Sequence, residues 1–292
     1  MGEKRGMARK IKISAGVLNV RLHPHTPERY AEFLNDIYGL RQPVKLRGDR
    51  HGIISLLDRS EAAEGIISGI ITTFLDIDFD GTWFSTAALQ DATDEEISKV
   101  SIPDNIHPNA ASFYFQLNTK NHRIYFQTYS SGKTLSVRSA LALFSHLSQV
   151  GNVAEKYGDI QITVVQSREA LERIFALDVI KSITITIQKP NADIFADDFE
   201  EQIEAHLNQS HSKKMTIAYE AEPGGSIVPT DEIKAIGAIA LENGSVNVAG
   251  RDESGAVTRS SNDHPRVIQE KYDPDAVSES QAFKRMLPQG NA

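Results

Sequence analysis

Residues 65–78, GIISGIITTFLDID, constrain the fold more than any other stretch, because β-branched side chains dominate them and no charge appears before Asp76. A run of this composition is typical of a strand that is buried on both faces of a sheet. Two shorter β-rich runs precede it, at about 42–47 and 51–57, and the polar turn Arg47–Gly52 between them indicates a hairpin. The sequence therefore predicts three neighbouring strands, with a basic turn before the central strand and carboxylates after it.

Residues 11–39 predict a strand followed by an amphipathic helix. The strand covers about 11–22, and Thr26-Pro27-Glu28 supplies the hydroxyl cap, the first-turn proline and the acidic side chain that helix N-termini favour. Apolar side chains then recur at helical spacing and predict one buried face: Tyr30, Phe33, Leu34 and Ile37.

Residues 112–129 predict a second hairpin with a defined register. The four-residue loop Thr119–His122 would pair Asn118 with Arg123 and set Phe115 opposite Phe126 on an apolar face. The other face would carry polar and aromatic side chains: Tyr114, Gln116, Tyr125 and Gln127. In this register we expect Phe115→Asp to be damaging and Tyr125→Asp to be tolerated.

The second half alternates strands and helices. Strands are predicted near 160–165, 182–188, 214–219 and 245–249, and helices near 168–177, 197–208 and 230–242. The expected fold class is α+β with two mixed α/β domains: an antiparallel-rich sheet in the first, and alternating strands and helices in the second. The predicted boundaries are a disordered segment 1–10, domains over 11–152 and 158–262, and an irregular tail over 263–292 that is polar and contains proline.

Composition excludes several classes of protein. The chain has no cysteine, which removes disulfides, thiolate metal sites and cysteine nucleophiles. No apolar run approaches the ~18 residues of a membrane span, and no apolar segment follows the basic start as in a signal peptide. We therefore expect a cytoplasmic protein that contacts no membrane and needs no cofactor.

Charge is distributed unevenly along a chain whose net charge is -8. Residues 1–51 carry eleven Lys and Arg against five Asp and Glu, and residues 105–154 carry four cations and no acid. Such blocks permit a phosphate-binding face on an acidic protein, because attraction depends on the local field. The candidate nucleic-acid-binding side chains are Lys45, Arg47, Arg50, Lys120, Arg123, Tyr125, Lys133 and Arg138. The alternatives are ordinary variation of surface charge and, for the Tyr125 face of the hairpin, a face covered by a helix.

Two motifs resemble phosphate or metal sites. On a strand, Asp76, Asp78 and Asp80 would share one face and could hold Mg²⁺ for phosphodiester cleavage, with Asp49 as a further ligand. The alternative is a strand end that enters a polar turn. The sequence SSGKTLS at 130–136 lies between a strand and a helix, but the first glycine of a P-loop is absent, so we expect no nucleotide hydrolysis there.

Several segments carry a family resemblance: GVLNVRLHPHTPERY, VKLRGDRHG, FLDIDFDGTWF, IPDNIHPN and HRIYFQTY. Over about 10–275 the chain resembles an uncharacterised bacterial family with a domain of unknown function, whose members look like companions of phage-defence loci. Its second half is also similar in element order to the A protein of the lambda Rex exclusion pair and to the B component of the Kiwa system. Those relatives imply a dimeric, DNA-binding sensor or effector.

The expected function is therefore non-enzymatic DNA binding in antiviral defence, by a homodimer that has a protein partner from the same locus. Two alternatives stay open. One is a Mg²⁺-dependent nuclease that uses the three aspartates, and the other is an adaptor that binds only proteins.

Overall fold

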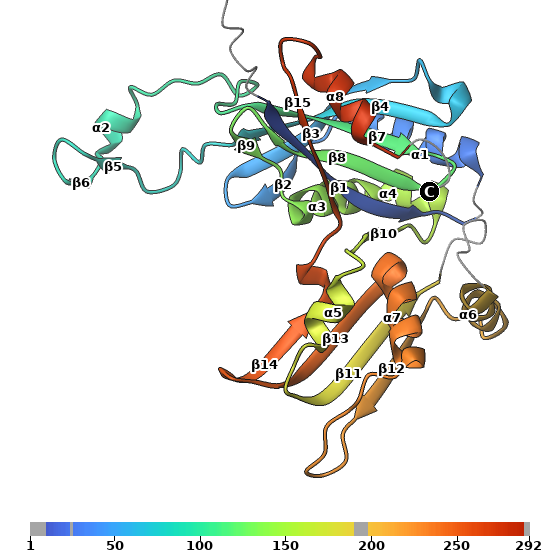
Figure 1. Ribbon diagram of the computed structural model, residues 1–292. Helices are drawn as coiled ribbons and strands as arrows, with labels where there is room; N and C mark the ends of the chain where they lie inside the picture. Colours follow the sequence, from blue (N-terminus) through green and yellow to red (C-terminus); the bar gives the residue numbers. More distant parts are fainter. Residues whose placement is uncertain (1–9, 24–25, 190–197, 289–292) are drawn as a thin grey trace, which may run out of the picture.

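The computed structural model describes residues 10–23, 26–189 and 198–288, which form two large antiparallel sheets with helices packed on them and one small two-stranded sheet (Figure 1). The α+β class is confirmed. The segment 1–10, which we expected to be disordered, lies outside the described residues except for Lys10. Residues 289–292 of the predicted tail also lie outside them. None of the described helices is long and apolar enough to cross a membrane.

In the described residues the first sheet has nine strands. Their order is β10-β1-β8-β7-β4-β3-β2, with β15 beside β1 and β9 beside β8. The strands are β1 (Ile11–Arg21), β2 (Val44–Arg47), β3 (Arg50–Asp58), β4 (Ile66–Leu75), β7 (Ala111–Asn118), β8 (Arg123–Ser130), β9 (Lys133–Thr134), β10 (Gln161–Val164) and β15 (Val267–Tyr272). The short helix η1 (Ala62–Glu64) joins β3 to β4.

Three helices cover one face of this sheet: α1 (Pro27–Gly39), α3 (Val137–Ser148) and α4 (Gly151–Tyr157). Thr26 caps α1 by accepting from the backbone N of Arg29, and the four apolar residues predicted to be buried are buried. The Phe115 ring meets Phe144 of α3 edge-on, with centroids 5.8 Å apart. The apolar face predicted for the 112–129 hairpin thus packs against these helices in the main hydrophobic core.

The hairpin register is confirmed, but its other face is not exposed. Phe115 lies opposite Phe126 and Asn118 opposite Arg123. The last helix, α8 (Glu279–Met286), covers the opposite face, where Tyr125 is only 1% exposed and packs in one cluster with Phe283. The expectation that Tyr125→Asp would be tolerated is therefore wrong.

The C-terminal residues complete the first sheet instead of forming an irregular tail. β15 pairs with β1 from Ile11 opposite Tyr272 to Gly16 opposite Val267. Ser278 then caps α8 by accepting from the backbone N of Gln281. The sequence did not reveal β15 and α8, because only the inner face of each is apolar. Their polar outer residues and the nearby prolines are typical of an irregular segment.

The second sheet is inserted between two strands of the first. β10, which we expected in the second domain, pairs with β1, so the first unit consists of residues 11–164 together with 267–288. The second unit, residues 166–263, has the strand order β12-β11-β13-β14. Its elements are α5 (Ala170–Phe175), β11 (Val179–Gln188), α6 (Asp198–Gln209), β12 (Lys214–Glu220), α7 (Asp231–Asn243), β13 (Gly244–Asp252), β14 (Gly255–Ser260) and η2 (Ser261–Asp263).

β4 is not fully buried on both faces as its composition suggested. Ile67, Gly69 and Ile71 are buried, whereas the residues of the other face from Ile66 to Thr72 are half-buried. The reason is that α8 lies over β1, β15 and β7 and leaves the β4 part of that face with less cover.

Residues 76–110 leave the sheet after β4 and return at β7, and we call this segment the arm (Figure 1). It contains β5 (Phe84–Ser85), β6 (Gln90–Asp91) and α2 (Asp94–Ile97), the last of which begins after Thr93 as predicted. No residue of the arm is buried.

Candidate nucleic-acid interface

One end of the first sheet collects segments that are far apart in the sequence, and we call it the arm end because the arm leaves from it. Strand register places Ser14 opposite Tyr129, and Tyr129 opposite Thr134. On the other side of the sheet it places Arg50 opposite Leu75, one residue before the arm. The start of β1, the β8–β9 turn and the β2–β3 turn therefore share this end.

Seven cations lie at the arm end: Lys10, Lys12, Lys45, Arg47, Arg50, Lys133 and Lys271. All except Arg50 are exposed. They extend from β15 to β2, which is six strand spacings of ~4.8 Å, or roughly 29 Å along the sheet. Sequence reasoning found four of them and missed Lys10, Lys12 and Lys271, because only the pairing of β1 with β8 and β15 brings them to this end.

Lys12 and Lys271 lie directly opposite each other on β1 and β15. Like charges in this position repel each other, so the pair weakens the sheet unless an anion offsets the repulsion. This cross-strand pair is the kind of local conflict that an anionic ligand would relieve.

The basic turn has the hairpin geometry that the sequence predicted. Arg47 pairs with Arg50 across Gly48, whose φ of +54° favours glycine. Arg50 donates from Nη1 to Thr73 Oγ1 at 3.2 Å, and within the described residues neither arginine forms an ion pair with a carboxylate. The Arg47 guanidinium is thus available to a ligand.

The other candidate side chains lie elsewhere. Lys120 and Arg123 are at the opposite end of the sheet, where Asn118 pairs with Arg123. Arg123 is 7% exposed and its Nη2 lies 2.6 Å from Glu242 Oε2 of α7, so it joins the two units. Arg138 of α3 pairs with Asp263 at 3.2 Å. Tyr125, buried beneath α8, has no face on which a base could stack.

The three aspartates do not share a strand face, because β4 ends at Leu75. Asp76 faces two histidines instead: His107 Nδ1 is 3.5 Å from Oδ1, and His51 Nδ1 is 4.0 Å from Oδ2. Asp78 accepts from the backbone N of Asp80 in a local turn. No group of three or more acidic or histidine side chains in the described part of the chain is arranged to hold a metal ion, so the nuclease alternative has no assembled site.

A groove of about 810 Å³ lies beside these cations, between β1, β8, β15 and the start of α8. Lys10 and Lys12 line it together with the rings of Tyr129 and Tyr272. Glu279 forms part of its wall and is held by Gln127 Nε2 at 2.6 Å and Ser130 Oγ at 3.2 Å. In proteins that bind single-stranded nucleic acid, ammonium groups contact the phosphates and aromatic rings stack on the bases. The groove has side chains of both kinds.

The SSGKTLS segment forms a tight β-turn, not a phosphate-cradling loop. Ser130 pairs with Lys133, and Ser131 and Gly132 adopt φ values of +47° and +80° between them. We expect Lys133→Ala to leave ATP affinity unchanged, because a two-residue turn cannot wrap a triphosphate. Isothermal titration of both proteins with Mg-ATP checks this, and saturable micromolar binding that disappears in the variant would contradict it.

A family model described as domain of unknown function (DUF4747) matches residues 11–288. No curated protein and no solved structure matches the chain. The match confirms the resemblance to a family of unknown function over most of the chain, and its description makes no reference to phage defence.

Proposed function

Because the chain belongs to the DUF4747 family, whose description assigns no activity, we propose from its geometry that it binds nucleic acid, with DNA as the ligand, at the arm end of the first sheet. The observation that carries the proposal is the row of seven cations over roughly 29 Å. DNA carries one phosphate per ~3.4 Å of each strand, so the row matches the length of about eight phosphates.

The chemistry of the row indicates backbone contacts and little base readout. Its members are lysines and arginines on strand ends and turns, and none of them lies on a helix; α2 of the arm has only four residues and is acidic, so it does not suit a major groove. Phosphate contacts fix position without reading sequence. The Tyr129 and Tyr272 rings in the adjoining groove would add stacking with unpaired bases, so single-stranded DNA is the preferred form.

The double change Lys45→Ala, Arg47→Ala tests the site. Both side chains are exposed on β2, so we expect a small change in Tm. The salt slope of DNA binding should fall by about two units, because each variant position leaves one phosphate without its cation. Fluorescence anisotropy with a labelled oligonucleotide across a salt series measures the slope.

The matched control is Lys120→Ala, an exposed cation at the opposite end of the sheet, which should leave the slope unchanged. β2 is also an edge strand, and lysines on edges block unwanted pairing. If the double variant aggregates while its monomeric fraction binds DNA with the wild-type slope, the two cations protect the edge and do not bind phosphate.

We propose antiviral defence as the biological setting, on the family resemblance of the sequence alone. Phage plating on cells that express the wild type, the Lys45/Arg47 variant or the Lys120 variant tests it. Protection that the first variant loses and the second retains supports the setting, whereas equal plating on all strains contradicts it.

A further inference from the structure

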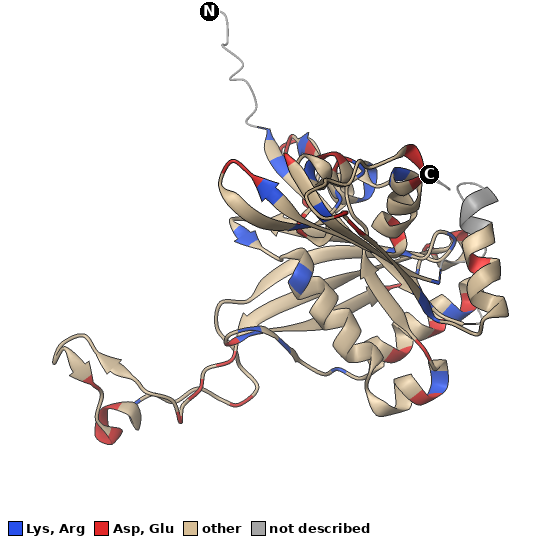
Figure 2. Cartoon of the chain, turned by 90° about the horizontal axis from the view of Figure 1, so that it is seen from below, with Lys and Arg blue, Asp and Glu red and all other residues tan. Residues whose placement is uncertain are grey.

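The arm exposes apolar side chains that a folded chain normally covers. Phe84 is 61% exposed and Leu89 77%, and Phe79, Val100 and Ile106 are also exposed. Figures 1 and 2 show the arm extending away from both sheets, so no other part of the described chain covers it. Large apolar side chains concentrated on one exposed segment in this way mark an interaction surface.

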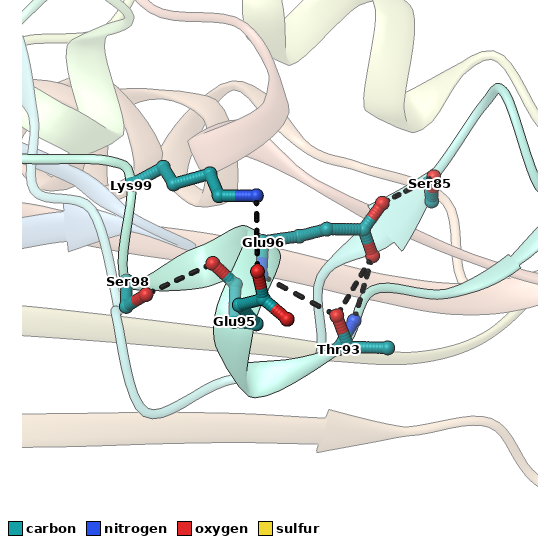
Figure 3. A network of polar contacts seen from close by, with 6 residues as sticks. All are labelled: Ser85, Thr93, Glu95, Glu96, Ser98 and Lys99. Atoms are coloured by element: carbon teal, nitrogen blue, oxygen red, sulfur yellow. Dashed lines mark hydrogen bonds and ion pairs between the residues drawn. The ribbon is translucent and has the colours of Figure 1, made fainter.

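Polar contacts give the tip of the arm a defined shape (Figure 3). Thr93 and Glu96 form a capping box at the start of α2. Glu96 also accepts from Ser85 Oγ at 3.4 Å, which ties α2 to β5, and Glu95 pairs with Lys99 at 3.6 Å. The tip is thus a small ordered module without a core, whose apolar side chains remain available to a partner.

The root of the arm is fixed to the sheet. The backbone N of Leu75 donates to Pro108 O at 2.9 Å, and the backbone N of Asp76 donates to Asp49 O at 2.8 Å. The Phe74 ring stacks on His107 with centroids 4.4 Å apart. These contacts direct the arm away from its own body, so its partner must be another molecule.

Charge indicates which molecule this is. Residues 76–104 hold eight acids and one lysine, and Figure 2 shows these acids along the arm. The arm end of the same chain holds seven cations. An acidic arm and a basic arm end on one chain are complementary surfaces between two copies of it.

We propose that the arm docks on the arm end of a second copy of this chain, which returns the contact with its own arm. Because the arm and the cations share one end of the sheet, a two-fold axis beside that end makes both contacts at once. A standard interface uses about 20–30 residues on each side, a number that the 35 residues of the arm from 76 to 110 can supply.

Leu89→Asp tests the apolar part of the contact, with Val228→Asp as the matched control. Leu89 is 77% exposed on the arm and Val228 is 76% exposed on the second unit, so neither change should affect folding. Each two-fold interface contains Leu89 twice. Loss of one buried anchor weakens affinity by about 30-fold. Because two anchors are lost, we expect the dissociation constant of the dimer to rise on the order of 1,000-fold.

Light scattering after size exclusion, without nucleic acid, gives the masses. We expect the wild type and Val228→Asp at twice the chain mass of 32.2 kDa, and Leu89→Asp as a monomer. A monomeric wild type at micromolar concentration and low salt overturns the proposal. So does a Leu89→Asp dimer, because the interface would then lie elsewhere.

Charge exchange tests the partner surface. One variant carries Lys45→Glu and Arg47→Glu at the arm end, and the other carries Asp91→Lys and Glu95→Lys on the arm; all four residues are exposed. The changes leave five cations and two acids at the arm end, or six acids and three lysines on the arm, so each variant alone should dimerise more weakly than the wild type. Mixed in equal amounts, the two variants place opposite charges together again at the changed positions of both contacts, so the mixture should dimerise more tightly than either variant alone. A mixture no tighter than the single variants, or single variants as tight as the wild type, overturns the assignment of the arm end as the docking surface.

The outcome is separable from that of DNA binding. Leu89→Asp retains every cation of the arm end and no partner arm covers them, so this monomer should bind DNA if the proposed function is right. A Leu89→Asp monomer that binds no DNA contradicts only the proposed function, and a wild-type monomer that binds DNA contradicts only the arm contact.

Discussion

Tyr125→Asp should unfold the first unit, even though alternation along β8 places this residue on the face that the sequence predicts to be polar. The ring is 1% exposed and packs in one cluster with Phe283 and the β1 residues Ile13, Ala15 and Val17. Loss of a buried aromatic ring costs about 3–5 kcal/mol, and burial of a carboxylate without a partner costs several more. The sum is comparable with the whole stability of a typical domain, about 5–15 kcal/mol.

Circular dichroism and thermal melting measure this loss, and Tyr125→Phe is the control. The control keeps the ring and removes only a hydroxyl that accepts from Asn121 Nδ2 at 3.3 Å, so it should cost about 1 kcal/mol. Phe115→Asp, on the opposite face, should match Tyr125→Asp in severity. A folded Tyr125→Asp protein with a Tm near that of the wild type would show that α8 does not cover this face in solution.

Local pattern was sufficient for the elements whose signals lie within a few residues. Thr26 and Thr93 cap the helices predicted to follow them, and the register of Phe115 with Phe126 followed from loop length and alternation. In each case the turn or cap and the apolar period are encoded in one short segment. The signals for such elements do not depend on distant residues, so the sequence alone can predict them.

The pairing of distant segments could not be predicted in this way. β10 and β15 both pair with β1, from positions about 140 and 260 residues farther along the chain. The β10 segment was predicted as a strand but carries no local signal of its partner, and β15 has no apolar run that distinguishes it. The same reason explains the misassignment of Arg123, whose partner Glu242 is 119 residues away. A cation that reads as exposed can be neutralised by a residue that only the tertiary fold brings near.

The candidate site was predictable in part. Lys45, Arg47 and Arg50 were identified because a turn exposes its side chains, and the structure leaves Lys45 and Arg47 exposed. The prediction that the three aspartates share a strand face was wrong for a physical reason. It assumed that the strand continues beyond Leu75, where β4 has already ended. The groove between β1, β8 and β15 has no sequence signal, because its walls come from both ends of the chain.

The second large effect is expected at the end of the chain. Phe283→Ala should destabilise the first unit by about 3–5 kcal/mol, because the side chain is 2% exposed and anchors α8 on β1 and β15. At ~2–4 °C per kcal/mol for a unit of this size, Tm should fall by roughly 10 °C. Amide hydrogen exchange in β15 should become faster as the free energy of unfolding falls. The reason is that β15 is held by β1 on one side and is covered by α8.

Arg285→Ala is the matched control, because Arg285 lies on the same helix and is exposed; it should change Tm little. A chain shortened to end after Pro274 removes α8 entirely and uncovers Ile13, Val17 and Tyr125. This chain should aggregate or unfold, whereas an irregular tail could be removed without effect. If the shortened chain keeps the wild-type Tm, α8 contributes nothing to the fold, and Tyr125 must be covered in some other way.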